Sequence, residues 1–150
     1  MKKGTVGWRE WIALPGLGVE AVKAKVDTGA RTSAIHAWKV RHFERDGREH
    51  ISFCLHPLQD NDSYVVEAEA PLLEMRKVRS SNGQEQRRFV IETEVEISDT
   101  RYPIELTLTN RDEMGFRMLL GRQALRRRWL VDPGKSYLTR ADADNEGDED

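Results

Sequence analysis

Val26-Asp27-Thr28-Gly29-Ala30 is the stretch from which the rest of the chain is interpreted. The residues before it, from Val19 to Val26, alternate between apolar and polar, and this two-residue period predicts a strand that delivers Asp27 to a turn. Gly29 would let the backbone approach the carboxylate closely, and the Thr28 hydroxyl could hydrogen-bond a neighbouring loop. Asp and Gly are also ordinary turn residues, so the tripeptide alone leaves a purely structural turn open.

A second glycine motif lies near the end of the chain. Met118-Leu119-Leu120-Gly121-Arg122 is an apolar strand that runs into Gly-Arg, and Gln123 to Trp129 is the one segment for which we expect a helix. Between the two motifs, Ser80-Ser81-Asn82-Gly83 predicts a hairpin tip, because Asn-Gly suits a type I′ turn. The rest of the chain reads as about eight short hairpin-linked strands, which predicts an all-β barrel or sandwich.

Three features follow one another in the order seen in retropepsins. They are an Asp-Thr-Gly-Ala loop, a glycine-tipped hairpin, and an apolar-apolar-Gly-Arg segment before a C-terminal helix. More specifically, the stretch KAKVDTGARTSAIHA (residues 23–37), preceded by GWREW (residues 7–11) and Leu14-Pro15, resembles the signature of a bacterial family labelled "ATP-dependent zinc protease". That family is associated with ATP-grasp ligases that add glutamates to a ribosomal protein. The resemblance covers roughly Val22 to Leu130 and implies a retropepsin-like closed barrel with one short C-terminal helix.

The resemblance implies an aspartic protease in which Asp27, Thr28 and Gly29 form the catalytic turn. Such an enzyme needs two carboxylates that share one proton, one acting as base on water and the other as acid. The chain has one Asp-Thr-Gly and no Asp-Ser-Gly. We therefore expect a symmetric homodimer with Asp27 and its mate at the two-fold axis.

The hairpin from Arg76 to Arg88 lies where a retropepsin carries the flap that closes over substrate. It holds five bases against one acid, namely Arg76, Lys77, Arg79, Arg87 and Arg88 against Glu85. A lid of this charge would attract an acidic peptide, so Arg76, Arg79 and Ser80 are candidate substrate-binding residues. The alternative is a solvated edge hairpin whose charges prevent sheet-to-sheet pairing.

Arg31 and Thr32 mark a departure from retropepsins, which usually carry acidic residues after Asp-Thr-Gly-Ala. In retropepsins the arginine of Gly-Arg pairs with that acid, but Arg122 cannot pair with Arg31. Our hypothesis is that Arg31, with Arg122, faces substrate carboxylates; alternatively, Arg122 is a structural fork that binds carbonyls or a nearby acid. The remaining candidate substrate-binding residues are Ala30, Ser33 and His36.

The zinc and ATP in the family label have little support in the residues. His50, Cys54 and His56 project from one face of an expected strand and could ligate zinc, but no His-Glu-x-x-His or Cys-x-x-Cys occurs. We predict no metal ligand and no cofactor, and any ATP dependence would come from a partner glutamate ligase of the ATP-grasp type. A zinc-dependent peptidase and a non-catalytic binding module for acidic peptides remain alternatives.

The adjacent Arg126, Arg127 and Arg128 point in different directions on a helix, so direct nucleic-acid binding is not expected.

Composition favours a cytoplasmic protein without a membrane segment. No apolar run approaches the ~20 residues that span a bilayer, no apolar segment of a signal peptide follows the basic N-terminus, and a single Cys54 excludes an internal disulfide. The last ten residues carry six acids and no base, which leaves 24 bases against 20 acids in the remainder. We expect one retropepsin-like domain over residues 1–140, a disordered acidic tail over 141–150, and an acidic or glutamate-tailed protein as substrate.

Overall fold

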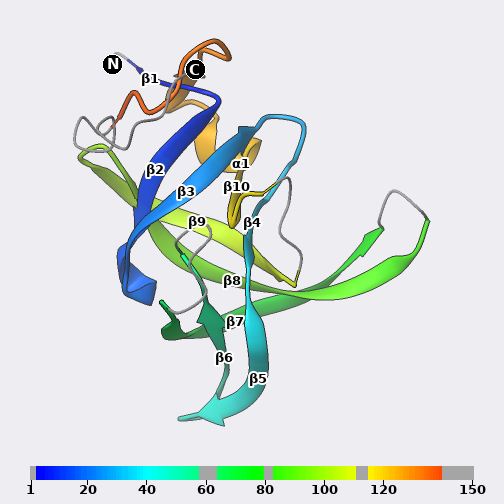
Figure 1. Ribbon diagram of the computed structural model, residues 1–150. Coiled ribbons are helices and arrows are strands. Elements are labelled where there is room, and N and C mark those ends of the chain that lie inside the picture. The colour runs from blue at the N-terminus through cyan, green and yellow to red at the C-terminus, as the bar shows by residue number, and fades with distance from the viewer. Residues whose placement is uncertain (1–2, 58–63, 80–82, 111–114, 140–150) are drawn as a thin grey trace.

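Six strands close into a barrel, which confirms the predicted all-β, retropepsin-like fold (Figure 1). The computed structural model describes residues 3–57, 64–79, 83–110 and 115–139. Neighbouring strands follow the order β2 (Arg9–Leu14), β3 (Val19–Asp27), β10 (Met118–Gly121), β4 (Ser33–His36), β9 (Thr100–Thr109) and β8 (Glu85–Ile97). The ring closes where Ala13 of β2 pairs with Glu96 of β8. In this arrangement β3 and β10 run parallel and end side by side.

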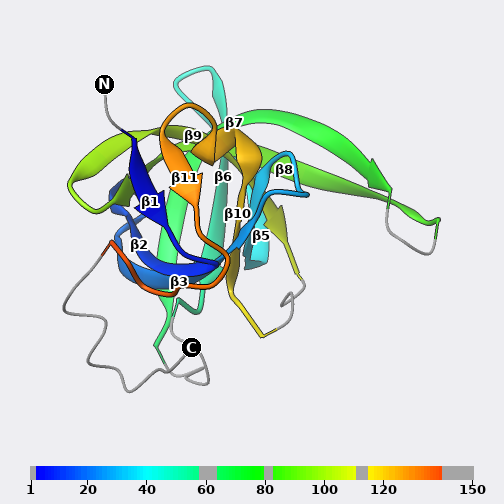
Figure 2. The ribbon, with the colours of Figure 1, turned by 90° about the horizontal axis from the view of Figure 1, so that it is seen from above.

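The sheet continues beyond the barrel through β7 (Val66–Arg79), β6 (Arg48–Leu55) and β5 (Trp38–Arg45). Figure 1 shows β5 and β6 extending to one side of the barrel, while the hairpin of β7 and β8 reaches away to another. A separate parallel ribbon joins β1 (Gly4–Val6) to β11 (Trp129–Val131), and Figure 2 shows these two strands side by side. The helical elements of the described segments are η1 (Pro15–Leu17) and α1 (Arg122–Leu125), and neither is long and apolar enough to cross a membrane.

Alternating side chains build the core of the barrel. In β2 the burial pattern has period two, with Ile12 and Leu14 fully buried. From the other strands, apolar side chains meet them in one cluster that includes Val22, Ala24, Ile35, Ile91, Val95, Leu106, Met118 and Leu120. This alternation leaves every second side chain of β3 and β10, including that of Asp27, outside the core.

Several expected elements have other bounds. The helix expected over Gln123 to Trp129 ends at Leu125, because Arg126 has a non-helical ψ of 132° and Arg127 a φ of 71°. The segment before the hairpin is one continuous 14-residue strand, β7. Tyr137 and Leu138 follow an isolated bridge between Arg9 and Ser136 and do not belong to a strand. Residues 141–150, expected as an acidic tail, lie outside the described residues.

Glu10 fastens the C-terminal segment to the barrel. Its side chain is fully buried, and its two oxygens accept hydrogen bonds from the backbone N–H groups of Gly7 (2.7 Å), Leu138 (2.9 Å) and Thr139 (3.1 Å) and from the Thr139 hydroxyl (2.8 Å). Tyr137 is also buried and stacks on Trp11, with ring centroids 6.3 Å apart. The sequence analysis did not anticipate this attachment.

Candidate active site

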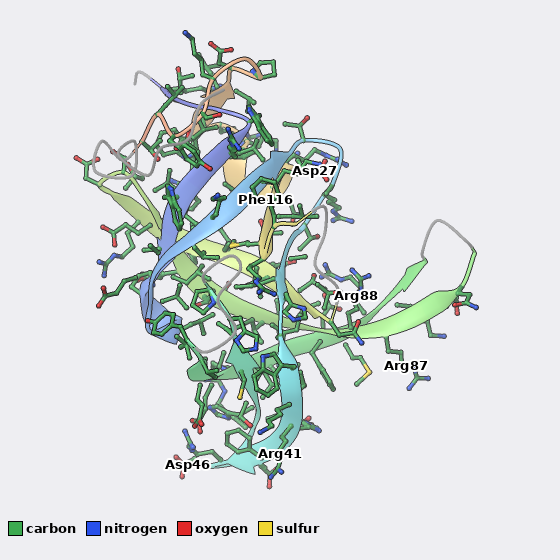
Figure 3. The ribbon with its side chains drawn as sticks, viewed as in Figure 1. Asp27, Arg41, Asp46, Arg87, Arg88 and Phe116 are labelled. Carbon is green, nitrogen blue, oxygen red and sulfur yellow. The ribbon has the colours of Figure 1, made fainter. Side chains whose placement is uncertain are left out.

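Asp27 is the last residue of β3 and lies beside Gly121, its partner in the parallel pair with β10. The side chain is half-buried, at the end of the barrel where Figure 3 labels it. The backbone N–H of Gly29 donates to Asp27 Oδ1 at 3.1 Å, and the N–H of Ala30 donates to the Asp27 carbonyl at 3.1 Å. These two bonds close the turn and limit the freedom of the carboxylate, as the Asp-Thr-Gly pattern predicts.

The second glycine motif binds directly to the Asp27 turn. The Gly121 N–H donates to Ser33 Oγ at 3.0 Å, the Arg122 N–H to the Ala30 carbonyl at 2.9 Å, and the Gln123 N–H to the Arg31 carbonyl at 3.1 Å. A Cβ atom on Gly121 would lie 2.6 Å from the Thr32 carbonyl carbon, so only glycine allows this approach. The two motifs singled out from the sequence therefore form one structural unit.

Arg122 supports the turn from its exposed side. Its Nη1 atom donates to the carbonyl oxygens of both Thr28 and Gly29, each at 3.2 Å. This is the structural fork considered above as the alternative for Arg122. A direct contact between Arg122 and substrate stays a prediction.

The other candidate residues of the loop differ in exposure. Arg31 is exposed, whereas Ala30 and His36 are half-buried. Ser33 is only 1% exposed, and its Oγ atom faces the Gly121 N–H rather than solvent. Arg31 is therefore the candidate in this loop that is best placed to meet a substrate, while Ser33 holds the loop together.

Arg76 connects the base of the β7–β8 hairpin to the loop. Its guanidinium forms ion pairs with Glu74 and, at 3.2 Å, with Glu105, and Nη1 donates to Thr32 Oγ1 at 3.5 Å. The hydrogen bond to Glu74 is the main cause that raises the pKa of Arg76, so this side chain stays charged. The backbone of Arg79 belongs to β7, and Ser80 lies outside the described residues.

The histidines proposed as alternative zinc ligands have other contacts. His50 Nδ1 lies 3.2 Å from the Arg48 carbonyl, and His56 stacks on Trp38 with centroids 5.0 Å apart. Within the described part of the chain, no three His, Cys, Asp or Glu side chains are grouped as a metal site requires. Nothing in this part of the molecule therefore offers a built zinc site.

Two contacts of the site could not be read from local sequence. Glu105 reaches Arg76 across 29 residues of chain, and Gln123 supports the loop through its backbone. Neither residue belongs to a recognisable motif. The only available signal is strand register, which becomes known only after the sheet order is known.

Comparisons with known proteins agree with this geometry. A family model described as RimB-like, "Retropepsin-like aspartic endopeptidase RimB", matches residues 5–142; the description mentions neither zinc nor ATP. A "Probable alpha-L-glutamate ligase" of Shewanella pealeana is 47% identical over 135 residues, which are 90% of this chain and 30% of that protein. A protein of the same name from Parasynechococcus marenigrum is 51% identical over 136 residues, covering 91% of this chain and 29% of that protein. The chain thus spans less than a third of the length of these relatives.

The fold also resembles the crystal structure of a Legionella pneumophila protein of unknown function. The TM-score is 0.78 at 24% sequence identity, and the match covers 93% of this chain and 100% of that one. At this identity the similarity concerns the fold alone.

Proposed function

Because this chain belongs to the RimB-like family of retropepsin-like aspartic endopeptidases, we propose that it is a cytoplasmic peptidase that acts as a homodimer on glutamate-rich or polyglutamylated protein tails. The observation that carries the proposal is the constrained Asp27 turn, in which Gly29 binds Oδ1 and Arg122 binds the Thr28 and Gly29 carbonyls. A carboxylate held in this way can present one oxygen to a water molecule in a fixed direction.

The reaction requires a second carboxylate, and the sequence contains a single Asp-Thr-Gly. A second copy of the chain related by two-fold symmetry supplies it. One Asp27 then takes a proton from water, whose oxygen attacks the scissile carbonyl carbon. The other Asp27, which carries the shared proton, hydrogen-bonds the carbonyl oxygen, and the departing amine receives a proton when the C–N bond breaks.

Positive charge near the turn supports an acidic substrate. Arg31 is exposed in the Asp27 loop, and the nearby β7–β8 hairpin carries Lys77, Arg87 and Arg88 in addition to Arg76, whose charge is offset by Glu74 and Glu105. Both relatives described above are named as glutamate ligases, and a ligase that adds glutamate produces a tail of this chemistry. We infer that this chain acts in the same setting, on a glutamate-tailed ribosomal protein and with a glutamate ligase as partner.

The test is mass spectrometry of a glutamate-tailed ribosomal protein after incubation with wild type, with Asp27→Asn, or with wild type and a chelator. We expect loss of tail mass with wild type, with or without chelator, and none with Asp27→Asn. Asp46→Asn is the matched control, because Asp46 is an exposed turn residue at the far end of β5 from Asp27 (Figure 3). Tail loss that the chelator stops would contradict the aspartic mechanism in favour of a zinc peptidase.

A binding module for acidic peptides is the second candidate. The names of the relatives favour it, because a domain that forms less than a third of a ligase could hold the tail that the ligase extends. Under this alternative, wild type and Asp27→Asn would bind a glutamate peptide equally and neither would shorten it.

A further inference from the structure

Strand register identifies the side chains that share a surface with Asp27. Side chains alternate between the two faces of a strand, and directly paired residues lie on the same face. Leu119 pairs with Lys25 of β3 and with Ala34 of β4, while the residues next to it, Met118 and Leu120, are buried in the core. The outer face of β3, β10 and β4 therefore runs without interruption from Asp27 over Leu119 and Ala34.

This face carries two arginines next to the apolar pair. Arg117 precedes Met118 and is half-buried, and its carbonyl accepts the His36 N–H at 2.8 Å. His36 pairs with Thr109 of β9, which lines a pocket together with Arg88 of β8. This face thus passes over four neighbouring segments of the sheet, from Arg117 to His36, Thr109 and Arg88.

Figure 3 separates Arg88 from its neighbour Arg87. The Arg88 side chain lies on the same side of the hairpin as the Asp27 loop, whereas Arg87 points to the opposite side. The register agrees, because Arg88 pairs with Arg76 and Arg87 with Lys77. Arg88 is half-buried and Arg87 exposed. Between Arg87 and Arg88, only Arg88 can contribute to the surface that contains Asp27.

The pocket beside Arg88 suits a carboxylate side chain. It has a volume of about 330 Å³ and is lined by Arg87, Arg88, Leu108, Thr109 and Asn110. On the face of Asp27, Arg88 and Thr109 supply a guanidinium and a hydroxyl donor. Arginine presents a fork that matches a carboxylate.

We propose that Arg88 and Arg117 form a subsite that binds acidic side chains of the substrate, one at each arginine, with Leu119 and Ala34 in contact with the aliphatic parts of these side chains. The inference rests on the proposed function and adds specificity-determining residues to it. Arg117 stands four positions before Gly121, the partner of Asp27, and this is roughly 13 Å along a strand. The subsite therefore selects an acidic residue about three to four positions from the cleaved bond.

Peptide binding to the Asp27→Asn chain tests the subsite without relying on cleavage. The probes are a fluorescein-labelled peptide of eight glutamates and its all-glutamine counterpart, measured by fluorescence anisotropy at low salt. Adding Arg88→Gln or Arg117→Gln should weaken binding of the glutamate peptide roughly 10- to 100-fold, as expected for a lost charge-assisted hydrogen bond, and change binding of the glutamine peptide less than about threefold. Two separate variants are used so that one misfolded protein does not decide the result, and melting temperatures establish folding.

Arg41→Gln is the matched control, because it removes the same charge from an exposed position on β5, away from Asp27 (Figure 3). If Arg41→Gln weakened binding of the glutamate peptide equally, the effect would come from the long-range electrostatic field of the protein, and this would overturn the subsite. Unchanged binding in both arginine variants would also overturn it, as would equal losses for the two peptides or no glutamate binding by the parent chain. Arginine-dependent binding together with an uncleaved tail would refute the peptidase and leave the subsite standing.

Discussion

Replacing Glu10 should detach the C-terminal segment and destabilise the barrel. The carboxylate is fully buried and accepts four hydrogen bonds, three of them from the backbone N–H groups of Gly7, Leu138 and Thr139. In Glu10→Ala these donors lose their acceptor. In Glu10→Gln the side chain keeps its shape, but one oxygen becomes an NH₂ group that faces other donors.

The magnitude follows from the number of bonds. A hydrogen bond to a charged group contributes about 1.5–3 kcal/mol, and a buried donor without acceptor costs about 1–3 kcal/mol. The four terms do not add fully, because burying the carboxylate itself costs several kcal/mol. We therefore expect a loss of about 3–5 kcal/mol in the free energy of unfolding for Glu10→Ala and about 2–3 kcal/mol for Glu10→Gln. If the C-terminal segment detaches while the barrel stays folded, the loss in the free energy of unfolding cannot exceed what the attachment of this segment contributes.

Urea denaturation measures the loss, and hydrogen exchange at residues 137–139 shows whether the segment opens first. Glu94→Gln is the control, because Glu94 is exposed on β8 and should change stability by less than about 0.5 kcal/mol. A loss below about 1 kcal/mol for Glu10→Ala, with unchanged exchange at residues 137–139, would refute the reasoning.

Three further predictions concern the candidate active site and the barrel. Gly121→Ala should abolish peptidase activity and lower the free energy of unfolding in urea by about 1–3 kcal/mol, since its Cβ would meet the Thr32 backbone. Gly134→Ala is the control and should do neither, because the nearest atom to its Cβ is 3.5 Å away. An active Gly121→Ala variant would contradict the proposed loop geometry. Arg122→Lys should lower kcat about tenfold with little change in melting temperature, because the shorter lysine side chain does not bring its ammonium to the position from which Nη1 binds both carbonyls. Full activity would show that these two bonds are dispensable. Burial raises the pKa of Tyr102 above 10.0, so its contribution to stability is complete below pH 10 and is lost as pH rises through the folded-state pKa. Urea midpoints between pH 9 and 11 should fall more steeply for wild type than for Tyr102→Phe, and parallel curves would show that Tyr102 does not cause the fall.

The parts of the fold that local sequence encodes could be predicted. Apolar alternation predicted β3, and the two glycine motifs predicted the turn at Asp27 and the strand that runs into Gly121, because each depends on residues close in sequence. The short helix could not be bounded in this way. Arg126 and Arg127 have ordinary helix propensity, and only the pairing of Trp129 in β11 explains why the chain leaves the helix at Leu125.

The contacts that complete the site depend on sheet order instead. Glu10 looked like any polar residue of a half-buried strand, yet three of its four hydrogen bonds come from residues 128 and 129 positions away. Arg88 was counted only among the bases of the hairpin and Arg117 was not singled out, because their place on the face of Asp27 follows from the register. A pattern of period two shows that a strand has two faces, but it does not tell which other strands share each face.

The bonds between Asp27's turn and the Gly121 motif also determine when the site can exist. The contacts from Gly121 and Arg122 to the loop join residues 88 to 94 positions apart. A nascent chain that has reached Asn110 already contains Asp27 but none of these donors. The carboxylate is therefore fixed only after β10 and α1 have left the ribosome, and the strands that emerge before them cannot form the site by themselves.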